Sequence, residues 1–365
     1  MNIFVVFVFW FFAAQALILL TQLPFRKKKR GGKRVALSAA VKFLLAVGFA
    51  ALVLAGPVIL RPVQPVMMAL YTALFAEAAA EVLYAVYLRL CGAERSFTHF
   101  KLFSLALGAV FLTFGMLNMQ LVVPRYHTYT SDKLSSPHRL VFVADMHVGS
   151  AQPFEVVEKT VEKIKREQPD FVILGGDMTD DYTTRDEMES AFALFSQMDC
   201  PVYYIYGNHD RQGYAEYAGG RKYTPEELES ALLENGIKPL RDEFVRISPD
   251  LTLLGREDLS EADGRTDSAS IVDPAPESYL IVADHQPGDF ESAVSYGADL
   301  QLSGHTHAGQ LFPLGWLYAA VGRVCGDYRS GSSVMNVSAG VSGWRMPLRT
   351  QQRSSFEVID LLPAD

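Results

Sequence analysis

The chain has 365 residues, of which 49% are apolar and 20% charged, with a formal net charge of −8. Residues 1–130 carry 13 basic and 3 acidic side chains, whereas the rest of the chain carries 20 basic and 38 acidic ones. Nucleic-acid binding depends on Lys and Arg that neutralise phosphates, so this acidic part argues against a nucleic-acid partner. The apolar residues concentrate in the first third, which excludes a single soluble domain.

Four apolar runs occupy the first third, at residues 3–23, 35–60, 65–88 and 102–123. About 20 helical residues cross a hydrocarbon core of ~30 Å, so residues 1–124 predict a transmembrane region with four helices. A cleaved signal peptide begins with positive charge, but here the basic cluster follows the first run. We therefore interpret that run as a membrane span.

The basic cluster, RKKKRGGKR at 26–34, also predicts the orientation of the chain. Loops rich in Lys and Arg remain in the cytoplasm, which places the first loop inside and the N-terminus outside. Four crossings then place everything after residue 124 outside the cytoplasm. We expect a multi-pass plasma-membrane protein with an extracytoplasmic domain, although one misjudged helix would invert this topology.

Glu77 and Glu81 are four residues apart on the third predicted helix and therefore share a face. Charge inside a bilayer is costly and often marks a functional or paired group. The alternative is that both side chains are protonated or packed inside the bundle.

After the apolar part, residues 125–138 are polar and contain Ser, Thr and Pro, which predicts a linker. From residue 139 to 365, short β-rich runs first alternate with amphipathic stretches near 153–167, 185–198 and 224–235. Later strand-like runs have fewer helices between them. The pattern predicts an α/β domain in which two sheets form a sandwich with helices outside.

Polar residues gather directly after the strand-like runs of this domain. The motifs are ADMHVG, GGDMTDD, YGNHD, VADHQP and LSGHTHAG, and they contain five of the eight histidines. Ligand sites of α/β folds collect at the carboxyl ends of strands, so we expect these side chains to converge. Singly, each motif could be an ordinary turn. Together, carboxylate, imidazole and amide groups favour a pair of divalent ions such as Mn²⁺, Zn²⁺ or Fe²⁺.

These five motifs, in this order, resemble the calcineurin-like metallophosphoesterase superfamily. The segment LSGHTHAGQ is similar to membrane-associated bacterial members that carry GHTHGGQ, with Ala308 in place of a glycine and DMH in place of the usual DLH. The resemblance covers residues 139–361 and does not extend to the apolar helices. It implies a four-layer α-β-β-α sandwich and a two-metal phosphoester hydrolase.

The resemblance also implies a role for each motif residue. Asp177 would bridge two ions through its two oxygens. The remaining metal ligands would be Asp145, His147 and His307 for one ion and Asn208, His285 and His305 for the other. A metal-activated hydroxide would attack phosphorus, because bound metal lowers the pKa of water to ~7. The resemblance gives His209 the role of protonating the leaving group, with Asp180 orienting its ring.

Three arginines near these motifs, Arg211, Arg345 and Arg349, could clamp a phosphate. Solvated surface arginines are the simpler interpretation, and we leave them out of the predicted site.

We therefore expect a membrane-anchored phosphoesterase acting on a phosphodiester or a lipid-linked phosphate, since four helices exceed what anchoring requires. One alternative is a phosphodiesterase for soluble nucleotides or glycerophosphodiesters, with the helices as a tether. A second is a membrane receptor or scaffold that binds metal without turnover. The presence of every ligand position argues against the second.

Overall fold

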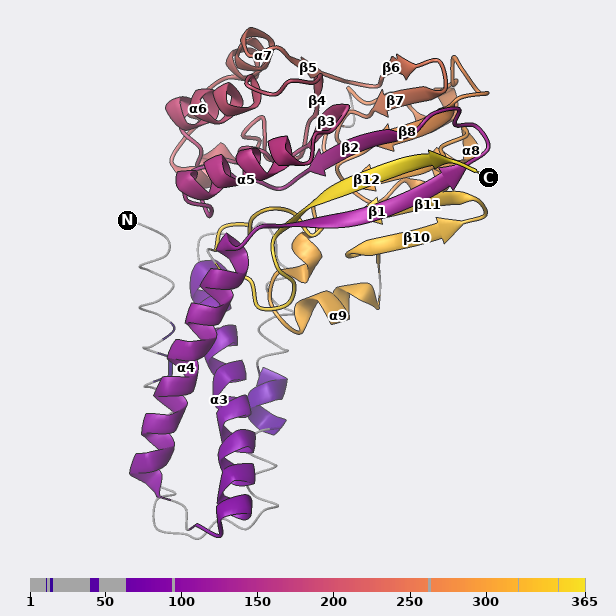
Figure 1. Cartoon of the computed structure of the whole chain (residues 1–365). Helices are drawn as coiled ribbons and strands as arrows, with labels where there is room; N and C mark the ends of the chain where they lie inside the picture. Colours follow the sequence, from indigo (N-terminus) through magenta and orange to yellow (C-terminus); the bar gives the residue numbers. More distant parts are fainter. Residues whose placement is uncertain are drawn as a thin grey trace. The chain divides into compact units, whose positions relative to one another are not determined.

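The structure, a computed structural model, describes residues 11, 14–15, 40–45, 64–93, 96–261, 264–320, 322–346 and 348–364. It divides into two compact units, Met1–Met116 and Leu117–Asp365. The first unit contains α3 (Gln64–Cys91) and most of α4 (Phe97–Gln120) (Figure 1).

Two helices in the described residues are long and apolar enough to cross a membrane, within α3 and α4. They coincide with the third and fourth predicted spans, although α4 ends at Gln120 rather than at residue 123. The first two predicted spans fall largely outside the described residues, so the four-span arrangement stays a prediction.

Glu77 and Glu81 are both buried in the first unit and contact the same cation. The Lys42 Nζ atom lies 2.9 Å from Glu81 Oε1 and 3.6 Å from Glu77 Oε2. Glu77 also accepts a short hydrogen bond from Ser104 Oγ. Of the interpretations left open by the sequence, this geometry fits paired side chains packed inside a helical bundle.

The second unit contains two six-stranded sheets. The first has the order β1-β12-β2-β3-β4-β5, and the second has the order β10-β11-β9-β8-β7-β6. The strands of the first sheet are β1 (Val123–Ser131), β12 (Ser355–Pro363), β2 (His138–Val143), β3 (Phe171–Gly175), β4 (Val202–Ile205) and β5 (Ile237–Pro239). Those of the second are β10 (Gly326–Ser330), β11 (Ser333–Val337), β9 (Leu300–Ser303), β8 (Tyr279–Ala283), β7 (Leu251–Gly255) and β6 (Glu243–Ser248).

Helices cover the outer faces of both sheets. On the first sheet lie α5 (Phe154–Arg166), α6 (Arg185–Phe195) and α7 (Pro225–Glu234), and α8 (Phe290–Ser295) packs on the second. Figure 1 shows α5, α6 and α7 together on one side. The core between the sheets contains Phe142, Ile173 and Leu253, all fully buried. The predicted sandwich with helices outside is therefore confirmed.

Local sequence explains where the outer helices begin. Thr184 and Thr224 each accept a hydrogen bond from the backbone of a Glu three residues later, which forms a capping box before α6 and before α7. In α5, Val157, Val161 and Ile164 are buried at spacings of four and three, so one helical face packs on the sheet. These local signals allow the sequence to place the three helices correctly.

The predicted linker, residues 125–138, is wrong over its first half. Residues Val123–Ser131 form β1, which pairs in parallel with β12 from Val123–Ser355 to Ser131–Pro363. Tyr126, Thr128 and Thr130 are exposed, whereas Tyr129 between them is buried, which is typical of an edge strand with one face on the core. The second unit therefore begins within α4, at Leu117, and β1 follows that helix after two residues.

Candidate metal centre

Six of the seven predicted metal ligands form two clusters. Asp145, His147 and His307 make one, and Asp177, His285 and His305 make the other; within each, one potential ligand atom per residue lies within 4.8 Å of the others. Asp145 and Asp177 follow the parallel neighbours β2 and β3, and the histidines follow β2, β8 and β9. Convergence at the carboxyl ends of these strands is what the sequence predicts.

The ring nitrogens of the histidines are arranged for metal binding. His147 Nε2 and His307 Nε2 lie 3.2 Å apart. The other nitrogen of His307 donates to Ser342 O at 3.0 Å, and that of His285 donates to Gly175 O at 2.8 Å. These carbonyls fix the tautomer in which Nε2 has a free lone pair, as partners of metal-bound histidines do.

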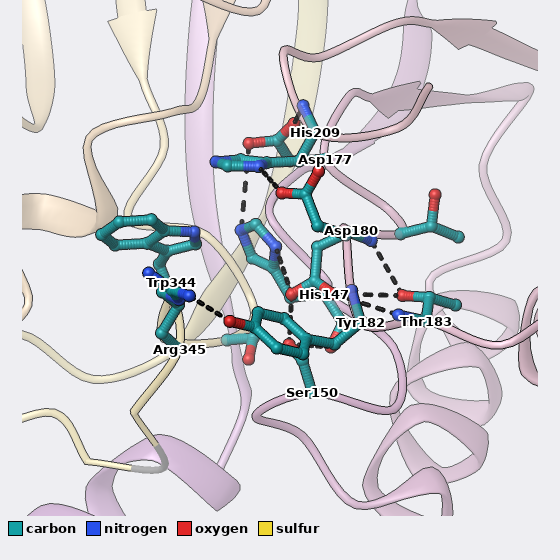
Figure 2. A network of polar contacts seen from close by, with 12 residues as sticks. His147, Ser150, Asp177, Asp180, Tyr182, Thr183, His209, Trp344 and Arg345 are labelled. Carbon is teal, nitrogen blue, oxygen red and sulfur yellow. Dashed lines mark hydrogen bonds and ion pairs between the residues drawn. The ribbon is translucent and has the colours of Figure 1, made fainter. Parts of the chain in front are cut away.

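Asp177 faces residues of both clusters, and Figure 2 shows it close to His147. Its Oδ2 atom is 3.2 Å from His285 Nε2 and 3.9 Å from His147 Nε2. Its Oδ1 atom accepts a hydrogen bond from the His209 backbone N–H at 2.8 Å. A single oxygen, Oδ2, therefore faces both clusters, whereas the sequence analysis expected both oxygens to do so.

Asn208, the seventh predicted ligand, lies directly before that His209 backbone contact. Its Oδ1 atom is buried without a hydrogen-bond partner, and so is His285 Nε2. An unpartnered buried acceptor costs about 1–3 kcal/mol. Coordination of a divalent cation would satisfy both atoms, so the residues present fit a two-metal centre.

The backbone of the centre is held in an uncommon conformation. Positive φ angles occur at Asp145 (57°), His147 (44°), Asp177 (50°), His305 (71°) and His307 (48°), which are five of the predicted ligands. Each such residue costs about 1–3 kcal/mol, and this kind of strain clusters at functional sites. The surrounding fold therefore stabilises a ligand geometry that the isolated segments would not adopt.

Burial dominates the electrostatics of the centre. It raises the pKa of Asp145 to about 6 and lowers the pKa of His305 to about 4, because the low-dielectric interior disfavours charge on either group. Burial also lowers the pKa of His147, but the hydrogen bond to Asp180 and the charges of Asp177 and Asp145 outweigh it and raise this pKa to about 9. Bound cations would offset the mutual repulsion of the carboxylates.

Residues 138–309 match the family model described as calcineurin-like phosphoesterase. The domain belongs to the calcineurin-like phosphoesterase family. An uncharacterised metallophosphoesterase of Helicobacter pylori is 32% identical over 64% of this chain and 62% of its own length. A transmembrane protein with a metallophosphoesterase domain from Danio rerio is 30% identical over 62% of this chain and 53% of its own. The Escherichia coli phosphodiesterase YaeI is 30% identical over 48% of this chain and 63% of its own. The chain thus matches less than two thirds of each of these relatives.

One predicted role in this phosphoesterase domain is wrong. Asp181, and not Asp180, contacts the His209 ring: its Oδ2 atom lies 2.7 Å from His209 Nδ1. Asp180 Oδ2 instead lies 3.4 Å from His147 Nδ1 and accepts a short hydrogen bond from Ser150. Asp180 Oδ1 accepts from the backbone N–H groups of Tyr182 and Thr183, and this turn directs the two neighbouring carboxylates to different histidines (Figure 2).

Asp210, which is not among the predicted site residues, is completely buried. Its carboxylate accepts hydrogen bonds from the backbone N–H groups of Asp177 at 2.9 Å, Gly207 at 2.7 Å and Thr179 at 3.1 Å. It thereby connects the loop after β3 to the loop after β4. Asp210 is the last residue of the motif GNHD. Its position directly after the Asn-His pair is the sequence signal that could have identified it as part of the site.

None of the three arginines is a solvated surface residue, so that interpretation was wrong. Arg349 is fully buried and donates to the carbonyls of His307, Gly340 and Ser342. Burial lowers its pKa to about 10. Arg211 forms a two-bond ion pair with Glu257, at 2.9 and 2.7 Å.

Arg345 lies beside the metal centre, in contact with Tyr182 and Trp344. It is 8% exposed, its guanidinium donates to the Tyr182 hydroxyl, and it lies 5.4 Å from the centroid of the Trp344 ring. The Trp344 ring centroid is 5.7 Å from that of His209. Figure 2 shows Trp344 and Arg345 facing Tyr182 beside His147. The arrangement places a cation and an aromatic ring beside His209.

The glycine before the histidine pair has a steric role. A Cβ atom on Gly304 would lie 2.6 Å from Asp145 Oδ2 and 2.7 Å from Ala144 Cβ. The backbone therefore approaches Asp145 closely at Gly304, where only a glycine fits without a shift. It allows the His305 N–H to donate to Asp145 Oδ1 at 2.9 Å.

Proposed function

We propose that this chain is a membrane-anchored phosphoester hydrolase with two divalent ions at the candidate metal centre. The observation that carries the proposal is the convergence of two sets of buried carboxylate and imidazole ligands with Asp177 Oδ2 between them. Ions of the Mn²⁺, Zn²⁺ or Fe²⁺ type suit this mixed donor set. When bound, they supply a nucleophile near neutral pH and offset charge on the phosphoryl oxygens.

In this proposal, Asp145, His147 and His307 hold one ion. Asn208, His285 and His305 hold the other, and Asp177 contacts both. The carbonyls of Ser342 and Gly175 keep two of the imidazoles in the ligating tautomer. Asp180 positions His147, because it contacts the ring nitrogen that does not face His307.

His209 supplies the proton that the leaving oxygen requires. Its ring is held by Asp181 at Nδ1, which leaves Nε2 for the substrate. Arg345 binds a phosphoryl oxygen through its guanidinium, which suits the planar geometry of phosphate recognition. Trp344 provides an apolar surface for the group attached to the phosphate.

The proposed substrate is a phosphodiester or a lipid-linked phosphate of the cell envelope. The Escherichia coli relative is called a phosphodiesterase, and the Danio rerio relative a transmembrane protein. In the proposed topology the four predicted helices form a multi-pass anchor in the plasma membrane and place the domain outside the cytoplasm. Helices α3 and α4 support this arrangement by their length and composition.

The full-length protein reconstituted in nanodiscs provides the test. We expect about two Mn²⁺ per chain by metal analysis and hydrolysis of bis(p-nitrophenyl) phosphate that depends on added metal. A lipid phosphate in the same bilayer should be hydrolysed with a higher kcat/KM than the soluble diester. Two bound ions without turnover of any phosphoester would instead support the scaffold alternative. Equal rates on both substrates would support a tethered enzyme for soluble substrates.

A further inference from the structure

An exposed apolar surface lies on α9 (Leu314–Ala319), shortly after the metal-binding histidines. Trp316 is 67% exposed, Leu317 41% and Tyr318 36%; we call these three side chains the α9 apolar face. The Phe312 ring packs edge-on against Trp316, with centroids 4.8 Å apart. Among the described residues of Leu117–Asp365, no other three consecutive large apolar side chains are exposed. Clustered apolar side chains of this kind mark an interaction surface.

The same unit contains the end of the apolar helix α4. Asn118, in the last turn of α4, donates from Nδ2 to Arg349 O at 3.1 Å and accepts at its carbonyl from Ser354 N at 3.3 Å. The side chains of Leu117 and Leu121 remain about half exposed there. The last turn of α4, where this helix would leave a bilayer, is therefore hydrogen-bonded to residues 349–354.

The α9 segment is bound to these residues as well. Gly315 N donates to Gln351 Oε1 at 2.9 Å, and Phe312 N donates to Thr350 Oγ1 at 3.0 Å. Residues 349 and 351 are at most ~7 Å apart along the chain. Figure 1 shows α9 beside this yellow segment of the chain. The α9 apolar face is thus held close to the end of a helix that is long enough to span a membrane.

A groove extends from the residues that follow α9 to His305. Its volume is about 570 Å³, and it is lined by Leu259, Gln286, Pro287, Gly288, His305, Gly322 and Arg323. Gly322 and Arg323 follow α9 in the chain, and His305 is one of the predicted metal ligands. A molecule bound in this groove would therefore contact His305 and the residues that follow α9.

We propose that the α9 apolar face inserts into the interfacial layer of the bilayer and that the groove receives the phosphate of a membrane lipid. The inference rests on the proposed function, because it requires α4 to be a membrane span and the centre to hydrolyse phosphoesters. Trp and Tyr favour the membrane–water interface, where their rings contact acyl chains and their polar atoms contact water. Because α9 and the end of α4 bind the same segment, residues 349–354, we favour a bilayer over a soluble partner.

Tryptophan quenching tests the insertion without requiring catalysis. The chain contains Trp10, Trp316 and Trp344, so the full-length Trp10→Phe variant in nanodiscs reports on the last two. We expect brominated lipids to quench a component of its emission that disappears when Trp316→Phe is added. Val272→Trp in that double variant is the matched control, because Val272 is 78% exposed as a single apolar residue. Its emission should not be quenched.

Activity tests the function of the insertion. Leu317→Glu should lower kcat/KM for a lipid phosphate in nanodiscs by about tenfold or more, because it removes an apolar contact and adds a charge. Its hydrolysis of bis(p-nitrophenyl) phosphate should not change. Quenching that Trp316→Phe leaves unaltered would overturn the inference, and so would equal loss on both substrates. A protein that binds metal but hydrolyses neither substrate would refute the proposed function, while the quenching would still decide whether α9 inserts.

A second copy of the chain is the competing occupant of the α9 apolar face. If Leu317→Glu converts a dimer to a monomer in detergent and Trp316 is not quenched in nanodiscs, the surface is an interface between copies. That result would overturn the membrane assignment.

Discussion

Replacing Asp181 with Asn tests the assignment of His209 as the group that protonates the leaving oxygen. The Asp181–His209 contact of 2.7 Å joins two side chains that are at most 10% exposed. Hydrogen bonds to charged groups contribute about 1.5–3 kcal/mol, and each 1.36 kcal/mol corresponds to a tenfold change in rate. Loss of this bond should therefore lower kcat by about 10- to 150-fold for a substrate that needs the proton.

The assay compares two diesters that differ in their leaving group. An alkoxide leaving group needs protonation, so Asp181→Asn should lower kcat strongly for an alkyl ester of phosphate. A p-nitrophenolate leaving group departs without a proton, so kcat for bis(p-nitrophenyl) phosphate should change little. His209→Ala should show the same dependence on the leaving group with a larger loss, while both variants retain two bound ions.

Asp180→Asn is the matched control, because Asp180 is the neighbouring carboxylate and contacts His147. It should weaken metal affinity by about 10- to 100-fold, as loss of a partner of a ligating histidine does. Excess Mn²⁺ should restore its activity, whereas Asp181→Asn should not respond to added metal. Equal losses on both substrates in Asp181→Asn would refute the proton-transfer role, and so would rescue of that variant by metal.

Removal of metal with a chelator should lower the Tm of the domain and should be reversed by Mn²⁺, because the buried carboxylates then repel one another; an unchanged Tm would argue against a metal centre at this position. Gly304→Ala should reduce bound metal to fewer than two ions per chain, since its Cβ would lie 2.6 Å from Asp145 Oδ2; a variant with full metal content would show that the loop can move. Arg345→Gln should raise KM for phosphodiesters more than it lowers kcat, whereas unchanged kinetics would remove Arg345 from substrate binding. Burial raises the pKa of Asp250, but hydrogen bonds from Ser135, Ser248 and His138 outweigh it and hold that pKa below its usual range. Because this pKa is lower in the folded state than in the unfolded state, the ionised Asp250 stabilises the folded state. This stabilisation is complete above about pH 4 and is lost as the pH falls further. The Tm of Asp250→Asn should therefore depend less on pH between 5 and 3 than that of the natural chain.

The sequence by itself predicted the side chains of the metal centre. Asp145, Asp177 and His305 each lie within two residues of the end of a buried strand, the first two in one sheet and His305 in the other. Ligand sites of α/β folds collect at the carboxyl ends of strands. Capping residues and helical periodicity likewise located α5, α6 and α7. Each of these signals is a pattern of residues close in the chain, so the sequence is sufficient to indicate it.

Only the tertiary structure decided which carboxylate serves which histidine. Asp180 and Asp181 are adjacent, and the turn that separates their directions depends on hydrogen bonds to Tyr182 and Thr183. The burial of Arg349 among the carbonyls of distant loops has no local signal either. The same holds for β1, because a polar strand at a sheet edge resembles a linker until its partner is known. In each case the deciding contact joins segments that are far apart in sequence, or depends on the direction of one side chain in a turn.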